Sequence, residues 1–465
     1  MKAIQVTPPL DRGIFHLLLA VVGLAPLPFG AVHSWAWSLL ALAIGGLLIA
    51  WWCARLAGDL PGEAIPGGPW GAFPPLLCFA AILAWTALQT IPGMPASLAN
   101  PLWGETANVL EEKIAGRISL DPQAAIPALI HLGTYGGIFW LALRYGRDVR
   151  RATRAVRMVA ASGALYALYG LGAYFLASHS VLWLKKTAYD GDVTATFINR
   201  NNYATFAGLG WLCLLALLFR GLTRHAPEGS GTGAWLHAIE TYIERRGWPV
   251  LLGAPVLAGA LLASHSRGGL LATMLGTLVF CLALRANAAH RHGFARRFTV
   301  VVLVLGGLAV LAGGSVVAGR LVETREDDRL TVYGLALDAL RNRLLMGTGA
   351  GTFEENFRMV RSPAILSTFA QAHNTYLETA LELGLPALIL ALAGLGWIAA
   401  LNWVGARERR RDAVYPCLGL AATTLVGSHA CLDFSIQIPA IAATYSLILG
   451  VALAQSWSTS SRAEW

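Results

Sequence analysis

The chain has 465 residues, of which 56% are hydrophobic and only 13% are charged, about half the charged share that is usual in soluble domains. This composition excludes an ordinary water-soluble enzyme, because apolar stretches of membrane-spanning length recur from one end to the other. The net charge of +9 comes from basic residues in short loops between these stretches, a pattern typical of membrane topology. We therefore expect no nucleic-acid partner.

Hydropathy over windows of about 20 residues predicts twelve membrane spans. They lie at about 14–32, 35–54, 73–92, 124–143, 158–178, 201–219, 248–264, 268–284, 298–318, 375–403, 413–428 and 438–456. Very short turns at 33–34 and 266–267 join neighbouring spans into antiparallel hairpins. We therefore expect residues 1–465 to form a single all-α transmembrane bundle.

The distribution of basic residues predicts the orientation of this bundle. The alternate loops that include both termini carry 22 of the 35 lysines and arginines, and the opposite loops carry 13 over longer stretches. The positive-inside rule then places both termini in the cytoplasm. The opposite loops, at about 93–123, 179–200, 265–267, 319–374 and 429–437, face outward.

The largest outward loop, 319–374, has the composition of a folded segment. It contains RLTVYGLALDALRNRLL, with apolar residues at helical spacing, and then the glycine-rich stop MGTGAGTF. We expect this loop to fold against the bundle and to cover the active site.

Polar residues gather in the outward segments TATFINRNNYATFAG, SHSRGGLLA, ETREDDRLTVYG and QAHNTYLETALELGLP. Their candidate ligand-binding residues are Arg200, Asn201, Arg267, Arg325, Arg329, His373 and Asn374. Arginine donors suit phosphate, and several that converge favour a diphosphate. Each arginine alone is equally consistent with a helix cap or a lipid contact, and convergence is not visible in the sequence.

His373 is the candidate general base. A histidine can take a proton from an attacking hydroxyl near neutral pH, although taken alone it is more often a helix cap or an interfacial hydrogen-bonding group. His265 and His429 lie at the same ends of spans, and a structural role is the stronger interpretation for both. We find no HExxH, Asp-rich triad or P-loop, so we expect no metal or nucleotide cofactor.

The same segments resemble the O-antigen ligase and polymerase family of bacterial integral membrane proteins. RLTVYGLALDALRNRLLMGTGAGTF and AHNTYLETALELGLP resemble the family core, and SHSRGGLLA and TFINRNNYATFAGL resemble its two preceding arginine-bearing segments. LQTIPGMP resembles its first outward loop. The resemblance runs through residues 80–440, with the ligase-like core at about 196–440.

The resemblance implies a metal-independent, inverting glycosyltransferase of GT-C fold in the bacterial cytoplasmic membrane. Such enzymes transfer a glycan from undecaprenyl diphosphate to an acceptor sugar on the outer face, and in the ligase branch that acceptor is lipid A–core. Arg267 and Arg329 match family arginines proposed to engage the diphosphate or glycan, and His373 matches the histidine proposed to act on the acceptor. Arg200, Asn201, Asn374 and Arg325 are then candidate substrate-binding residues.

Three other functions remain open. A polymerase would join lipid-linked repeat units with the same motifs, and a related oligosaccharyltransferase would use a protein hydroxyl as acceptor. An anion transporter could also line a path with arginines, but ionisable residues are nearly absent from the span centres, which favours chemistry at the membrane surface. We expect a ligase-type transferase, with the polymerase close behind.

Overall fold

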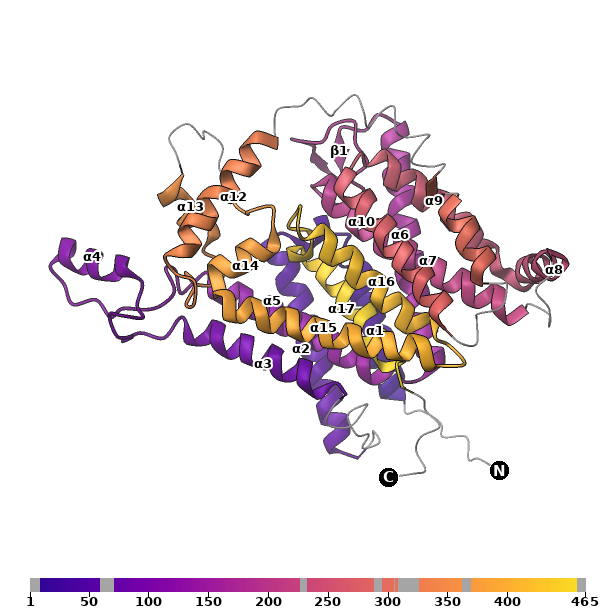
Figure 1. The fold of residues 1–465 in the computed structure, drawn as a ribbon, viewed down its shortest axis with the longest axis horizontal. Helices are drawn as coiled ribbons and strands as arrows, with labels where there is room; N and C mark the ends of the chain where they lie inside the picture. The colour runs from indigo at the N-terminus through magenta and orange to yellow at the C-terminus, as the bar shows by residue number, and fades with distance from the viewer. Residues whose placement is uncertain are drawn as a thin grey trace.

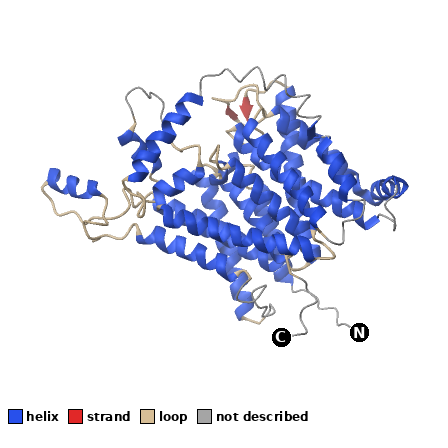
Figure 2. Cartoon of the chain, viewed as in Figure 1, coloured by secondary structure: helices blue, strands red, loops and turns tan. Residues whose placement is uncertain are grey.

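The structure is a computed structural model that describes residues 9–58, 71–225, 232–287, 295–304, 306–307, 326–361 and 369–457. These residues are almost entirely helical, with one small antiparallel hairpin, Ser180–Val181 (β1) and Leu184–Lys185 (β2) (Figure 2). The longer helices are α1 (Pro9–Leu24), α2 (Ser34–Leu56), α3 (Phe73–Leu88), α4 (Pro101–Leu110), α5 (Ala125–Tyr145), α6 (Val149–Phe175), α7 (Arg200–His225), α8 (Thr232–Tyr242), α9 (Trp248–Ala263), α10 (Arg267–Ala286), α12 (Glu326–Arg341), α13 (Phe353–Val360), α14 (Thr375–Leu383), α15 (Leu385–Glu408), α16 (Val414–His429) and α17 (Pro439–Ala454). Single turns lie at Phe29–Ala31, Ile243–Gly247 and Ser435–Gln437.

The all-α membrane architecture is confirmed, but the expected count of twelve spans is not. Each predicted range other than 298–318 overlaps one or two described helices, and much of that one range lies outside the described residues. Six described helices are long and apolar enough to cross a bilayer: α2, α5, α6, α7, α10 and α15. The 16-residue helices α1, α3, α9, α16 and α17 are each about 24 Å long, short of the roughly 30 Å of a hydrocarbon core.

The predicted span 375–403 is wrong as one continuous helix. It breaks at Gly384, whose φ of 82° lies in the left-handed region that glycine adopts without strain. A Cβ at this position would lie 2.3 Å from the carbonyl oxygen of Leu345. The break separates the short helix α14 from α15, and α14 packs against α12 as well as against α15 (Figure 1).

The centre of the bundle is formed by α7, α16 and α17. Almost every residue of α17 is buried, and 83% of the apolar window of α7 is buried, against 22% for α15. A helix that is apolar all round and buried all round belongs in the interior of a bundle, whereas an apolar, exposed helix such as α15 suits a lipid-facing position. α7, α10 and α16 pack side by side, and their ends bring together the polar residues described below (Figure 1).

A smaller hydrophobic core lies beside the bundle, between α12, α13 and α14. It contains Val332, Ala336, Ala339, Leu340, Phe353, Phe357, Ala372, Ala380 and Leu381. The helix expected from RLTVYGLALDALRNRLL is thus present as α12, and its apolar face is the one buried here. We call α12, α13 and α14 with this core the side unit.

The glycine-rich segment MGTGAGTF anchors the side unit to the bundle. Gly347, Gly349 and Gly351 all have positive φ, and a Cβ at Gly349 would lie 2.1 Å from the Ser119 hydroxyl oxygen. The Leu120 amide donates to the Thr348 carbonyl at 2.7 Å, and Gln89 Nε2 donates to the Met346 carbonyl at 2.7 Å. These contacts hold the side unit against the connection between α3 and α5.

Candidate active site

The buried carboxylate of Asp433 is the centre of a polar cluster where α7, α10, α14 and α16 meet. Asp433 follows α16, and only 1% of its surface is exposed. Asn201 Nδ2 donates to Asp433 Oδ2 at 2.9 Å, and the Ser435 hydroxyl donates to Oδ1 at 2.8 Å. Asn201 in turn accepts a hydrogen bond from the Ser266 hydroxyl at 2.8 Å, which connects α7 with the start of α10. We call these residues, together with His373, the Asp433 cluster.

His373 faces this carboxylate at a longer distance. Its Nδ1 lies 3.7 Å from Asp433 Oδ2, which is beyond hydrogen-bond length, and has no other hydrogen-bond partner. The ring contacts Phe434 edge-on, with 5.0 Å between centroids, and its side chain is 22% exposed. Contacts of catalytic groups are often long without substrate and shorten when it binds. The geometry suits a base whose orientation is set by a buried carboxylate.

The backbone of His373 is held in an uncommon conformation. Its φ is 54°, in the left-handed region that non-glycine residues rarely adopt. The Tyr333 hydroxyl of α12 donates to the His373 carbonyl at 3.1 Å, and Glu378 Oε2 accepts from the Ala372 amide at 2.8 Å. Strained residues held by their surroundings cluster at functional sites. The side unit therefore fixes the position of His373.

Electrostatics around Asp433 favour its charged form. Burial alone would raise the pKa of this carboxyl, but the nearby His373 and His429 and the hydrogen bonds from Ser435 and Asn201 hold the pKa below its usual value. An ionised, buried carboxylate beside a histidine stabilises the protonated imidazole. His373 could therefore accept a proton from an attacking group.

Arg267 begins α10 directly after Ser266 of the Asp433 cluster. It is half-buried and makes no hydrogen bond or ion pair with another residue that the structure describes. The glycines that follow it serve helix packing: a Cβ at Gly268 would lie 3.1 Å from His429 Nε2, and one at Gly269 would lie 2.5 Å from the Ala204 Cβ. These glycines thus bring α10 close to α16 and α7.

Arg200 is engaged within the protein instead. Its Nη1 donates to Asp192 Oδ2 at 2.7 Å, and its guanidinium lies over the Tyr189 ring at 5.3 Å from the centroid. His265 Nδ1 contacts the other carboxylate oxygen, Asp192 Oδ1, at 2.7 Å. Asp192 is 4% exposed, so both of its oxygens are paired away from solvent. We call Asp192, Arg200 and His265 the Asp192 cluster.

Asn374 and the two loop arginines occupy different surroundings. The Asn374 side chain accepts from the Leu377 amide at 3.1 Å and caps α14, so its placement is that of a helix N-cap. Residue 329 lies in the first turn of α12, four residues before Tyr333 and therefore one turn away on the same face. Its side chain, and the whole of Arg325, lie outside the described residues.

The two carboxyl groups of α14 hold backbone turns at both ends of that helix. Glu378 accepts from the Ala372 amide beside His373, and Glu382 Oε1 accepts from the Phe353 amide at 3.0 Å. Burial raises the pKa of both groups, and for Glu382 the neighbouring charge of Glu378 raises it further. Both act as structural supports of the site.

Sequence reasoning missed Asp192 and the role of Asp433. The signals were present, because each is an acidic residue close to an apolar span, where a charge is costly unless it is paired. The partner of Asp433 lies 60 residues earlier, at His373, and no spacing rule connects the two. His429 has the structural placement expected of it: it is 2% exposed, and its Nδ1 lies 2.6 Å from the Thr205 hydroxyl oxygen.

Residues 252–392, just under a third of the chain, match a family model described as O-antigen ligase. Over these residues the chain is similar to the O-antigen ligase family. The match includes Arg267, Arg329 and His373 and confirms the resemblance seen in the sequence. No curated protein matches the chain. The match to the O-antigen ligase family supports a membrane enzyme of glycosyltransferase type that acts in polysaccharide assembly.

Proposed function

We propose that this O-antigen ligase family protein transfers a glycan from undecaprenyl diphosphate to a sugar hydroxyl of lipid A–core, with inversion at the anomeric carbon. His373 beside the buried Asp433 carboxylate is the observation that carries the proposal. It places a group able to take a proton from a hydroxyl inside the segment that matches the family. His265, the other histidine of this segment at the same end of the bundle, has its Nδ1 engaged by Asp192 at 2.7 Å.

The proposed base acts through its two ring nitrogens. Nδ1 faces Asp433, so Nε2, on the opposite side of the ring, is left for the acceptor hydroxyl. As the hydroxyl attacks the anomeric carbon, its proton passes to Nε2 and the bond to the diphosphate oxygen breaks. Asp433 stabilises the imidazolium that forms, as carboxylates do for catalytic histidines in general. Removing the proton makes attack by a weakly nucleophilic alcohol possible at neutral pH.

The diphosphate needs charge stabilisation as it leaves. Arg267 is available for this role because it has no acidic partner among the described residues, and its guanidinium fork suits phosphate oxygens. Arg329 is proposed as the second cation, because its position on α12 is one turn from the residue that bonds to the His373 backbone. Undecaprenyl diphosphate is a good leaving group once it is stabilised, so this mechanism calls for neither a metal nor a cofactor.

Arg200 and Asn201 have supporting roles in this proposal. Arg200 neutralises Asp192. The negative charge of this carboxylate is then not left to repel the diphosphate. Asn201 holds Asp433 and Ser266 in place. Asn374 fixes the start of α14, and Arg325 is proposed to bind the glycan from the side unit.

The expected topology fits this chemistry. With the positive-inside orientation, the Asp433 cluster and the side unit face the extracytoplasmic side of the inner membrane, where lipid-linked glycans are assembled. The cluster lies at the ends of the apolar helices α7 and α10, so a lipid tail could lie along the bundle while its diphosphate reaches the polar residues.

A deletion strain separates the proposed ligase from a polymerase. The producing bacterium without this protein should accumulate long polymer on undecaprenyl diphosphate while its lipopolysaccharide loses the polymer, as seen on gels of both fractions. Accumulation of single repeat units would instead identify a polymerase. Unchanged glycans in both fractions would refute the proposed function.

A further inference from the structure

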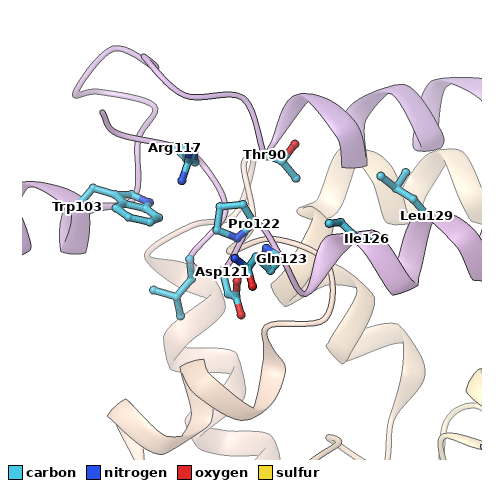
Figure 3. Close-up of a pocket in the computed structure, with 9 residues that line it drawn as sticks. Thr90, Trp103, Arg117, Asp121, Pro122, Gln123, Ile126 and Leu129 are labelled. Carbon is cyan, nitrogen blue, oxygen red and sulfur yellow. Dashed lines mark hydrogen bonds between the residues drawn. The ribbon is translucent and has the colours of Figure 1, made fainter. Parts of the chain in front are cut away.

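A cavity with polar and apolar walls lies apart from the Asp433 cluster, between α4, the start of α5 and the segment that joins them. Its volume is about 480 Å³, and it is lined by Thr90, Trp103, Arg117, Leu120, Asp121, Pro122, Gln123, Ile126 and Leu129. Trp103 and Arg117 lie on the α4 side and Ile126 and Leu129 on the α5 side, with Pro122 between them (Figure 3). The function proposed above does not use any of these residues.

The α4 side of the cavity is built with defined geometry. Trp103 Nε1 donates to the Ser119 carbonyl at 3.0 Å, which fixes the indole ring. The Arg117 guanidinium lies 5.5 Å from the Trp103 ring centroid, and the Asn100 amide donates to the Arg117 carbonyl at 2.7 Å. An aromatic ring fixed in this way presents a flat apolar surface with polar groups at its edge.

Polar atoms at the cavity have capacity for a ligand. Arg117 Nε is buried and has no hydrogen-bond partner among the described residues. Asp121 Oδ1 accepts from the Gln123 amide at 2.8 Å, and the other carboxylate oxygen makes no hydrogen bond with a described residue. Buried polar atoms without partners are uncommon in folded proteins and call for a ligand, ion or water.

The cavity lies where a membrane surface is expected. Ile126 and Leu129 belong to the first turns of α5, one of the six candidate spans, and Ile126 is 56% exposed. The polar wall formed by Arg117, Asp121 and Gln123 therefore meets the apolar surface of a span at its end. This is the boundary at which the sugars of a glycolipid join its lipid part.

The cavity is also connected to the proposed catalytic histidine. Leu120 in its wall bonds to Thr348, and Thr348 bonds to the carbonyl of Leu381 at the end of α14. His373 precedes the other end of this nine-residue helix, which is about 14 Å long. The cavity and His373 are thus connected through the two ends of one short helix.

We propose that the Trp103–Arg117 cavity binds the lipid-proximal sugars of a membrane glycolipid that the enzyme uses as substrate. Trp103 would stack on a sugar ring, Asp121 and Gln123 would bind hydroxyl groups, and Arg117 would bind an acidic group. The inference rests on the proposed glycan transfer and adds a substrate-recognition site to it. The same chemistry would suit the glycan of the donor or that of the acceptor.

Calorimetric binding to the full chain in nanodiscs tests the proposal. The two probes are core oligosaccharide released from the bacterium's lipopolysaccharide by mild acid, and repeat-unit oligosaccharide released from the lipid-linked donor. Wild type should bind one of them, and Trp103→Ala should weaken that binding by about tenfold. Trp103→Phe keeps the aromatic surface and should restore most of it. Loss with the core probe identifies the acceptor, and loss with the repeat-unit probe identifies the donor.

Matched controls separate the site from general effects on folding. Trp183→Ala removes an aromatic ring that is 72% exposed on the β1–β2 hairpin, and Arg341→Gln removes an exposed arginine from α12; both should bind as wild type does. Arg117→Gln should weaken binding by about tenfold. No binding of either probe by wild type, or binding within twofold of wild type for both Trp103→Ala and Arg117→Gln, would overturn the proposal.

Transfer kinetics distinguish this inference from the proposed function. Trp103→Ala should raise the KM for one glycolipid and leave kcat within about twofold, because it removes binding that is equal in ground and transition states. His373→Ala should bind both probes as wild type does. If His373→Ala transfers glycan normally, the proposed function fails whatever the cavity binds; if only the Trp103 effects are missing, the cavity proposal fails alone.

Discussion

Two buried aspartates lie at the same end of the bundle, and their partners differ in a way that distinguishes structure from chemistry. Asp192 has both oxygens engaged, by Arg200 at 2.7 Å and by His265 at 2.7 Å. Asp433 is bonded by neutral groups, Asn201 and Ser435, while its histidine stands off at 3.7 Å. Both oxygens of Asp192 are thus already paired. Asp433 is not in hydrogen-bond contact with His373, so His373 can still move toward it.

The comparison also separates the two arginines of the preceding segments. Arg200 is committed to the Asp192 cluster, whereas Arg267 has no ion pair in the part of the chain that the structure describes. A cation that already neutralises a buried carboxylate is poorly suited to bind a diphosphate, because each new contact competes with the old one. We therefore expect the Asp192 cluster to stabilise the fold, and His373, Asp433 and Arg267 to take part in glycan transfer.

The largest expected effect is loss of transfer in His373→Ala. Without the base, the acceptor hydroxyl must attack with its proton in place, so we expect transfer to fall by about a thousandfold or more. Transfer of glycan to lipopolysaccharide in the complemented deletion strain measures this. His179→Ala, which alters an exposed histidine of the hairpin region, is the matched control and should transfer normally. Normal transfer by His373→Ala would show that another group acts as the base.

Arg267→Gln should come next, with transfer lowered by about a hundredfold to a thousandfold because a cation is lost from the leaving diphosphate. The melting temperature in detergent should stay within about 1–2 °C of wild type, a change as small as that of a typical surface substitution. Arg267 has no partner among the described residues whose contact would be lost. Arg329→Gln is expected to act in the same direction. A large fall in melting temperature with retained transfer would show that Arg267, like Arg200, has a structural role.

Asp433→Asn should lower transfer by about tenfold to a hundredfold, the range typical of groups that orient a functional ligand or base. An asparagine cannot stabilise the imidazolium of His373 by charge, and its amide nitrogen would face the Asn201 donor. The kcat in a reconstituted assay should carry most of the loss. Asp338→Asn on the exposed face of α12 is the control. A kcat equal to that of wild type would remove Asp433 from the mechanism.

Asp192→Asn should act on stability and much less on chemistry. It leaves Arg200 without its counter-charge in a mostly buried place, and we expect a cost of about 1–3 kcal/mol in the free energy of unfolding. Thermal melts and transfer per folded molecule measure the two effects separately. Transfer per folded molecule that falls as far as it does in Asp433→Asn would show that the two clusters act as one site.

The smallest effect concerns the supports of the site and depends on pH. Burial raises the pKa of Glu382 to about 8, above its value near 4.3 in an unfolded chain. Its contribution to stability is therefore full below pH of about 4 and is lost as pH rises through about 8. Glu382→Gln has no such loss, so its melting temperature relative to wild type should rise by a few degrees between pH 5 and pH 8.5. A difference in melting temperature that does not change with pH would contradict this prediction. Glu354→Gln, on the solvent-facing side of α13, is the control.

The sequence predicted individual helices and motifs, but it did not predict which side chains contact one another in the folded protein. Hydropathy located the helices because membrane spans are apolar over their whole length, and several motifs in order carried the resemblance to the O-antigen ligase family. The break at Gly384 was missed, because an apolar run continues across it and only its contact with Leu345 requires the turn. The pairing of Arg200 with Asp192, and of His373 with Asp433, depends on tertiary contacts that no local pattern encodes.

The central claim is that glycan is transferred at the Asp433 cluster with His373 as base. The most direct measurement is transfer by the purified protein in proteoliposomes, with lipid-linked donor, lipid A–core acceptor and a chelator present. The account predicts polymer on lipid A–core with wild type and none above background with His373→Ala, at equal protein and equal melting temperature. Equal transfer by both, or anion flux without transfer by wild type, would contradict it.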